Sequence, residues 1–247
     1  MNSTSPRVAL VTGAARRIGA EIVRKLHAEG MNVILHYHGS HSAADDIANE
    51  LNALRENSLV TLQFDLLDTE NIDTFIQQAV SVWGRLDTVV NNASTFYPTA
   101  IDDISIEHWN DLIGVNVQAP LFICKACAPF LTQQQGCIVN IVDIHADRPL
   151  KGYPVYAIAK AGLAMLTKSM ARELAPAVRV NGIAPGAIMW PEIEDYEAVH
   201  QEIIERTALK REGHPSDIAD TAWFLINTAT YVTGQIIAVD GGRTLSN

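Results

Sequence analysis

Short, continuously apolar runs alternate along this chain with longer stretches that have one apolar face. Strands buried on both faces of a parallel sheet have such runs, because helices cover both sides of the sheet. The runs predict strands at residues 7–12, 32–37, 59–64, 86–91, 137–143, 178–183 and 235–239.

The stretches between these runs have helical periodicity. The clearest stripe consists of Ile72, Phe75, Ile76, Ala79, Val80 and Trp83, with Asp68 or Thr69 to cap its start and Gly84 to end it. Helices are predicted at residues 16–29, 43–55, 72–83, 107–131, 154–174, 197–206 and 215–227. Gly30 stops the first of these helices, and Pro154 opens the fifth.

Strands that alternate with helices predict an α/β fold. We expect residues 1–247 to form one Rossmann-like domain, a doubly wound parallel seven-stranded sheet with helices on both faces. Residues 187–211 interrupt the pattern with mixed polar and apolar positions. We expect this insert to cover a substrate, although a surface excursion would give the same pattern.

Composition and charge narrow the possible partners. Hydrophobic residues make up 48% of the chain and charged residues 19%, as in a globular protein. The net charge of -10 disfavours nucleic acid and anionic membranes. The short polar start and the three cysteines indicate the cytoplasm, and we expect no run of about 18 apolar residues that could span a membrane.

The sequence Thr12–Gly19 (TGAARRIG) follows the first strand and opens the first helix. Gly13 permits a tight turn and Gly19 a close approach of helix to sheet, so that the N–H groups at the helix start can bind a pyrophosphate. Arg17 stands where a middle glycine is common, and its guanidinium can contact that pyrophosphate and reach over a ligand. The alternatives are an ordinary strand-to-helix turn and a solvated arginine.

The end of the second strand bears on the choice between NAD and NADP. NAD-binding folds usually place an acidic residue there for the ribose, yet none occurs between Met31 and Ala44. His38, Ser40 and Arg16 can instead donate to a 2′-phosphate, which favours NADPH, and Asp65 is placed to contact adenine. A polar loop without function is the alternative.

Tyr156 and Lys160 are four residues apart and share one face of a predicted helix. A lysine close to a phenol lowers the pKa of that phenol, so the tyrosine becomes a usable proton donor. The spacing alone occurs by chance in many helices. The run Asn91-Asn92-Ala93, Asn116 and Pro185-Gly186 adds polar and turn residues near the carboxyl ends of other strands.

Together these motifs resemble the short-chain dehydrogenase/reductase family over essentially the whole chain. The resemblance implies that Tyr156 is the acid, that Lys160 binds ribose and tunes the tyrosine, and that Asn116 relays protons and positions the lysine. It also implies an assembly, usually a homotetramer. The implied cofactor-binding residues are Gly13, Arg16, Arg17, Ile18, Gly19, His38, Ser40, Asp65, Asn92, Ala93, Tyr156, Lys160, Pro185 and Gly186.

Asp143 departs from the family, which usually has serine 13 residues before the tyrosine. A serine donates to a substrate carbonyl, whereas an ionised carboxylate only accepts and would repel the carbonyl oxygen. Asp143 therefore suits a nitrogen heterocycle with N–H groups or a protonatable C=N. The alternatives are a helix cap or an ion pair with Arg148.

At this point the resemblance narrows to the pteridine reductase branch. The segments that carry it are TGAARRIG, LHYHGS at 35–40 and NNASTFYPT at 91–99, together with Asp143, Tyr156 and Lys160. It implies that Phe96 stacks on a pterin, that Ser94 binds polar groups of the ligand and that Arg17 bridges cofactor and pterin. Gly39 departs from the branch, which often has arginine there. A core position is the alternative for Phe96.

Our hypothesis is an NADPH-dependent reduction of 7,8-dihydropterins (dihydrobiopterin, dihydromonapterin or dihydrofolate) to tetrahydropterins. The rivals are a carbonyl or 3-oxoacyl-thioester reductase of the same fold, an NADPH-binding regulator without turnover, and a structural subunit. Cys124 and Cys127 form a C-x-x-C inside a predicted helix, where we expect packing and no metal. The histidines show no metal-ligand spacing.

Overall fold

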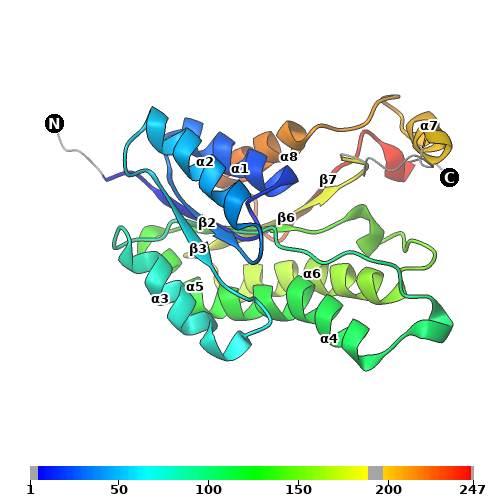
Figure 1. Ribbon diagram of the computed structural model, residues 1–247, viewed down its shortest axis with the longest axis horizontal. Coiled ribbons are helices and arrows are strands. Elements are labelled where there is room, and N and C mark those ends of the chain that lie inside the picture. The colour runs from blue at the N-terminus through cyan, green and yellow to red at the C-terminus, as the bar shows by residue number, and fades with distance from the viewer. Residues whose placement is uncertain (1–4, 189–196, 246–247) are drawn as a thin grey trace.

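One parallel sheet of seven strands, with the order β3-β2-β1-β4-β5-β6-β7, forms the centre of the molecule, as predicted (Figure 1). The computed structural model describes residues 5–188 and 197–245. The strands are β1 (Val8–Val11), β2 (Asn32–Tyr37), β3 (Leu59–Gln63), β4 (Thr88–Asn91), β5 (Cys137–Ile141), β6 (Arg179–Pro185) and β7 (Ile236–Val239).

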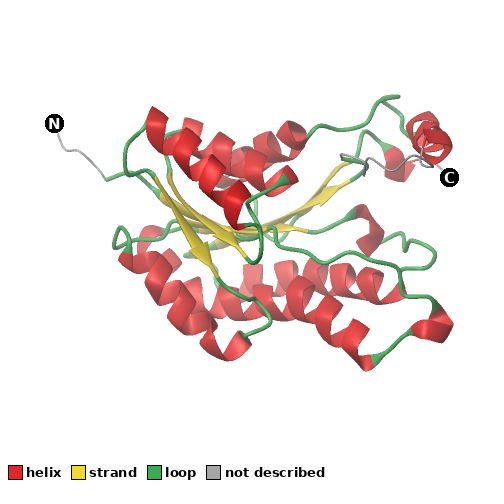
Figure 2. Ribbon diagram, in the orientation of Figure 1, coloured by secondary structure: helices red, strands yellow, loops and turns green. Residues whose placement is uncertain are grey.

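Helices cover both faces of this sheet, so that it forms the middle of three layers (Figure 2). The layer of α1, α2 and α8 lies on one face, and α3, α4, α5 and α6 lie on the other (Figure 1). Their bounds are α1 (Arg17–Ala28), α2 (His41–Leu54), α3 (Ile72–Ser81), α4 (Ile106–Ile113), α5 (Ala119–Gln134), α6 (Pro154–Glu173), α7 (Glu197–Arg206) and α8 (Pro215–Trp223).

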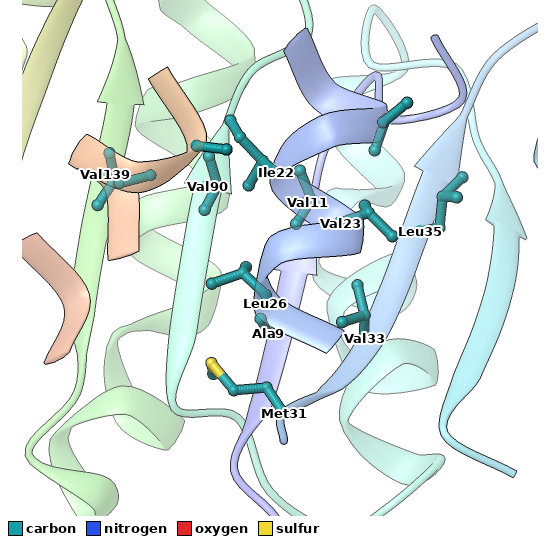
Figure 3. Close-up of a cluster of buried hydrophobic side chains, with 14 of the residues drawn as sticks. Ala9, Val11, Ile22, Val23, Leu26, Met31, Val33, Leu35, Val90 and Val139 are labelled. Atoms are coloured by element: carbon teal, nitrogen blue, oxygen red, sulfur yellow. The ribbon is translucent and has the colours of Figure 1, made fainter. Parts of the chain in front are cut away.

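The strand β1 shows how one apolar run contributes side chains to two hydrophobic cores, one on each face of the sheet. Ala9 and Val11 pack in the cluster under α1, while Val8 and Leu10 pack in the cluster on the opposite face. Because successive strand side chains point to opposite faces, a continuous apolar run is what two-sided burial requires. Figure 3 shows the first of these clusters, in which Ile22 and Leu26 of α1 lie over the sheet.

The strand order places a crevice in the middle of the sheet. β1 pairs with β2 on one side and with β4 on the other, so the connections leave β1 and β4 in opposite directions. In open parallel sheets, ligands bind at such a point, outside the carboxyl ends of the strands. The Thr12–Gly19 turn and the polar residues after β4 both lie at this edge.

The predicted helix over 107–131 is wrong in one respect, because a π-helical turn at Gly114–Gln118 separates α4 from α5. A second π-helical turn, Phe224–Thr228, follows α8. A Cβ atom at Gly114 would lie 2.5 Å from Leu67 Cδ2, so the chain passes close to its neighbour at the first turn. A π turn inserts one residue and re-aims the side chains beyond it, which a regular helical period does not anticipate.

The α4–α5 segment also overturns the expectation about apolar length. Ile106–Gln134 spans 29 residues with a mean hydropathy of 1.3 in its most apolar window, enough by length and composition to cross a membrane. Here part of its apolar surface packs in the core, since Ile123, Cys124, Cys127 and Leu131 are buried beside α3, while other apolar side chains of the segment stay exposed. A helix that is apolar on most sides is also what a buried position in a large core produces.

The predicted insert at 187–211 is described only in part, because residues 189–196 lie outside the described residues. Ile188 forms an isolated bridge with Gly213, and α7 occupies 197–206. The substrate-covering role of this insert stays a prediction.

Candidate active site

A cavity of about 520 Å³ lies at the carboxyl ends of the strands. Its lining includes every residue predicted from the sequence to bind cofactor or substrate. Of the four predicted catalytic residues, Asp143, Tyr156 and Lys160 line it, while Asn116 lies fully buried outside the lining. Residues from six strand ends, separated widely in sequence, thus meet in one crevice.

The Thr12–Gly19 turn is joined to the end of β4 by a small set of hydrogen bonds. Thr12 Oγ1 accepts from the backbone N–H of Asn92 (3.0 Å) and of Ala93 (3.1 Å). Asn92 Nδ2 donates to the carbonyls of Thr12 and Gly13, each at 2.9 Å. A Cβ at Gly13 would lie 2.7 Å from Ala93 Cα, and one at Gly19 would lie 2.5 Å from Asn92 Nδ2. Both glycines are therefore required by close approach to the loop after β4. For Gly13 only a tight turn was predicted, and its φ of +59° agrees with that, whereas for Gly19 the predicted neighbour was the sheet.

His36 supports the same turn and was missed from the sequence. Its Nδ1 accepts from the N–H of Gly13 at 3.0 Å, and its Nε2 lies 3.1 Å from the carbonyl of Phe64. The carbonyl can only accept, so the ring is the neutral tautomer with its proton on Nε2. Burial lowers the pKa of His36 to about 4, which keeps the ring neutral at pH 7. The available signal was a histidine inside an otherwise apolar strand.

The start of α1 is built to receive an anion. Its N-cap is Arg16, whose side chain makes no cap hydrogen bond, and its first turn holds no acidic residue. The positive end of the helix dipole and its N–H groups face the cavity without an acidic neighbour in that turn. Arg17 has φ +53°, the left-handed conformation that glycine adopts easily. The backbone here therefore has a conformation that favours glycine, while the residue there is arginine.

The far end of the cavity is open to solvent. The side chains of His38 and Asp65 are 72% and 51% exposed and lie 4.0 Å apart. Gly39 and Ser40 line the same end, and no atom lies within 4 Å of a Cβ built at Gly39. A Cβ atom would therefore fit at Gly39 without displacing a neighbour.

Asp143 and Tyr156 are joined directly. Tyr156 Oη donates to Asp143 Oδ2 at 2.7 Å, and Asp143 Oδ1 accepts from the N–H of His145 at 2.8 Å. The second bond caps the short helix Ile144–Ala146, so the cap alternative also holds. The Asp143 carboxylate thus caps the helix Ile144–Ala146 with one oxygen. This bond also orients the other oxygen towards the Tyr156 hydroxyl.

The expectation that Lys160 lowers the pKa of Tyr156 is wrong in this structure. Burial, and next the negative charge of Asp143, raise the pKa of Tyr156 well above its ordinary value. Lys160 Nζ lies 5.7 Å from the centre of the tyrosine ring and donates to the carbonyl of Ile141 at 3.1 Å. Burial lowers the pKa of Lys160 to about 8, and Asp143 opposes that shift. Burial and the Asp143 carboxylate therefore dominate the pKa of Tyr156, and the opposing, smaller effect comes from a side-chain hydrogen bond with Ser94.

Asn116 contacts the loop after β4 from the π-helical turn. Its Oδ1 accepts from Ser94 Oγ at 2.7 Å, and its Nδ2 donates to the carbonyls of Leu112 (2.9 Å) and Thr95 (3.1 Å). The resemblance implied that Asn116 positions Lys160, but these bonds of its side chain reach Ser94 and Thr95 instead. Its role as a proton relay stays a prediction.

Phe96 is 55% exposed at the cavity, so the alternative of a core aromatic is wrong. One face stacks on Tyr153, with ring centres 4.7 Å apart and planes 9° from parallel. The edge contact with Tyr156 has the same 4.7 Å separation at 75°. Tyr153, which the sequence did not single out, therefore backs Phe96 and holds its plane beside the reactive hydroxyl.

The cysteines are packing residues. Cys124 and Cys127 are fully buried, burial raises the pKa of both thiols, and Asn91 Nδ2 lies 3.8 Å from Cys124 Sγ. Within residues 5–188 and 197–245, no three His, Cys, Asp or Glu side chains come together in a way that could hold a metal ion.

The doubly wound sheet, the start of α1 without acidic residues and the presence of Tyr156 and Lys160 in one cavity are features of an α/β oxidoreductase that uses a nicotinamide dinucleotide. Residues 13–244 match the protein family described as "Enoyl-(Acyl carrier protein) reductase". The chain belongs to the short-chain dehydrogenase/reductase family.

Curated relatives in this family carry more than one activity in their names. The chain is 38% identical to "Pteridine reductase 1" of Leishmania tarentolae, over 99% of both chains. It is 36% identical to a 3-oxoacyl-[acyl-carrier-protein] reductase of Staphylococcus aureus, over 95% of this chain and 96% of the relative. A reductase of the same name from Synechocystis is 34% identical over 99% of this chain and 100% of the relative. The family is thus established, and the site must decide between substrates.

Proposed function

We propose that this protein is an NADPH-dependent pteridine reductase that converts 7,8-dihydropterins to tetrahydropterins. The hydrogen bond of 2.7 Å between Tyr156 and Asp143 carries the proposal. It puts a carboxylate beside the proton-donating hydroxyl, where a ketone reductase needs a hydrogen-bond donor for the developing alkoxide. A ring nitrogen that carries or receives a proton is stabilised at that position, whereas a carbonyl oxygen is repelled.

The aromatic wall of the cavity supports a flat substrate. Phe96, backed by Tyr153, presents a ring face next to Tyr156. A pterin stacked on this face would lie with its C=N bond against the tyrosine hydroxyl. Orientation of this kind contributes much of the rate enhancement when two reactants are held face to face.

The reaction needs a hydride and a proton. When bound, NADPH supplies the hydride, which adds to the carbon of the C=N bond and leaves NADP. Tyr156 supplies or relays the proton to the ring nitrogen, and its partner Asp143 exchanges protons with it. Lys160 and Arg17, which line the cavity, would hold the nicotinamide ribose and the cofactor phosphate, and Arg17 would also reach the pterin.

The preference for NADPH rests on the open end of the cavity. His38, Ser40 and Arg16 line it as possible donors to a 2′-phosphate, and Asp65 lies beside His38. The segment between Met31 and Ala44 has no acidic residue that would repel that phosphate. The proposal also includes a homotetramer, as the family resemblance implies, and the cytoplasm, as the polar start and the cysteines indicate.

A 3-oxoacyl-thioester reductase is the second candidate, favoured by the relatives that are 36% and 34% identical. It requires a donor for the 3-oxo group, and Asp143 offers none while ionised. The two candidates therefore differ in what they predict for one carboxylate.

The deciding experiment follows NADPH oxidation with dihydrobiopterin, dihydromonapterin and dihydrofolate beside a 3-oxoacyl thioester and a simple ketone. We expect turnover of at least one dihydropterin and negligible turnover of both carbonyl substrates. The proposal fails if the 3-oxoacyl thioester is the better substrate by kcat/KM. The same assay with NADH tests the cofactor preference.

A further inference from the structure

The loop after β4 is an extended segment whose side chains alternate between two sides. Residues 92–100 belong to no helix or strand. From Ser94 to Thr99, the even-numbered residues are exposed and the odd-numbered residues are partly or fully buried. Successive side chains of an extended chain point in opposite directions, so the register of this loop decides which residues reach a ligand. In the present register the Phe96 ring lines the cavity.

Two hydrogen bonds to backbone atoms hold the loop on either side of Tyr97. The carbonyl of Thr95 accepts from Asn116 Nδ2 at 3.1 Å. The N–H of Thr99 donates to the carbonyl of Gly152 at 2.8 Å. Both bonds restrain the main chain at the two ends of a short stretch, so the middle of that stretch depends on the contacts of the Tyr97 side chain.

The Tyr97 side chain reaches α4. Its Oη donates to Asp111 Oδ2 at 2.8 Å. Its ring packs against the buried cluster of Leu112, Val155 and Tyr156. Burial, and next the hydrogen bond to Asp111, raise the pKa of Tyr97 to about 12, so the hydroxyl keeps its proton and remains the donor. A hydrogen bond from a phenol to a carboxylate is stronger than one between neutral groups, which makes it an effective anchor.

The Phe96 ring depends on its loop for its position. It is more than half exposed, and in the described part of the chain its ring contacts are a stacked one with Tyr153 and an edge contact with Tyr156. Such contacts set the angle of the ring, but they allow it to slide together with its main chain. The distance between Phe96 and the reactive hydroxyl therefore follows the position of the loop.

The cofactor end of the same loop is anchored separately. The N–H groups of Asn92 and Ala93 donate to Thr12 Oγ1, at the start of the Thr12–Gly19 turn. A change in the loop at Tyr97 should therefore leave this turn intact, so that substrate binding and cofactor binding can be separated by experiment.

We propose that Tyr97 and Asp111 are positioning residues, whose hydrogen bond keeps the loop in register and so holds the Phe96 ring in the cavity as a wall for a flat substrate. This inference rests on the proposed function and deepens it. Without the bond the middle of the loop can shift, and Phe96 loses its fixed distance from Tyr156. The substrate then binds less tightly, while the cofactor binds as before.

The first test is Tyr97→Phe, which removes the hydroxyl and keeps the ring. We expect KM for a dihydropterin to rise about 3- to 10-fold, the loss that corresponds to one hydrogen bond, with kcat within about twofold and an unchanged affinity for NADPH. Asp111→Asn keeps an acceptor for the hydroxyl and should keep the KM of the unchanged protein. Tyr231→Phe is the matched control, since it removes the hydroxyl from a fully exposed tyrosine.

Asp111→Leu breaks the same bond from the other side and keeps the test decisive if Tyr97→Phe does not fold. Its KM for the dihydropterin should rise as well. The double variant should show no larger rise than the more affected single variant, because the two substitutions remove one interaction. Rises that multiply in the double variant would contradict the inference, since the two residues would then act independently.

A ¹⁹F spectrum of protein with 4-fluorophenylalanine in place of Phe96 reports the surroundings of the ring without any substrate. We expect its resonance to move towards that of the free amino acid in Tyr97→Phe and to stay in place in Asp111→Asn. An unchanged resonance in Tyr97→Phe, or an unchanged KM for a dihydropterin that the protein reduces, would overturn this inference alone. A protein that reduces no dihydropterin contradicts the proposed function, and the resonance then decides the positioning role by itself.

Discussion

The two ends of the cavity are built on different physical principles. At the inner end, Tyr156 and Lys160 are 4% and 2% exposed, and each polar atom described above has a specific partner. At the outer end, His38 and Asp65 are largely exposed and 4.0 Å apart, and Gly39 leaves open space. Buried polar groups must be hydrogen-bonded, so their arrangement at the inner end allows few alternatives. Exposed charged groups contribute little to stability, so residues at the outer end can be replaced without destabilising the fold.

The sharpest contrast between the ends comes from Tyr156→Phe. We expect turnover to fall roughly 1000-fold, since a positioned acid contributes about this much, while the affinity for NADPH changes little. Single-turnover kinetics and a fluorescence titration with NADPH measure the two quantities. Loss of NADPH binding in this variant would show that the Tyr156 hydroxyl is needed to hold the cofactor and would contradict its role as the proton donor.

Asp143→Ser restores the residue that the family usually has. We expect dihydropterin reduction to fall roughly 100-fold, because the group that interacts with the ring nitrogen is lost. Asp143→Asn is the control for shape, since it keeps the geometry of the carboxylate. The measurement is the steady-state kcat/KM of each variant for a dihydropterin and for a 3-oxoacyl thioester. Undiminished dihydropterin reduction by Asp143→Ser would contradict the proposal. So would a high activity of this variant on the 3-oxoacyl thioester.

The pH dependence tests whether the inner end needs its ammonium. The pKa of Lys160 lies at about 8, so the charged form is present below that pH and is lost above it. We expect kcat/KM to be about tenfold lower at pH 9 than on its plateau. Since Asp143 raises the pKa of Lys160, Asp143→Asn should move this alkaline decline to lower pH. A profile that is flat to pH 9.5 would mean that the charge of Lys160 is not required.

Gly39→Arg probes the outer end and has the smallest expected effect. A guanidinium would enter open space beside Ser40 and face the 2′-phosphate. An exposed charge pair of this kind should strengthen NADPH binding two- to fivefold, with no change in NADH binding and a loss of the gain at high salt. Gly39→Gln, of similar reach without charge, is the control. An equal gain for NADH would place the 2′-phosphate elsewhere.

The contrast between the ends also explains what the sequence could predict. The strands and the Thr12–Gly19 turn depend on local pattern, and so does the pairing of Tyr156 with Lys160 on one helix face. The π-helical turn at Gly114–Gln118 begins where the chain passes close to Leu67, a residue far away in sequence. The raised pKa of Tyr156 depends on how deeply it is buried and on the distance to Asp143, which no spacing along the chain reveals.

Arg17 sets folding stability and ligand binding against each other at a single position. Its φ of +53° would be free of strain for glycine, whereas an L-residue with a side chain pays about 1–2 kcal/mol for it. A chain selected only for thermal resistance would be expected to acquire glycine here. Arginine stands there instead. The fold therefore accepts a less favourable backbone conformation at Arg17, and in return a long, positively charged side chain lies at the edge of the cavity.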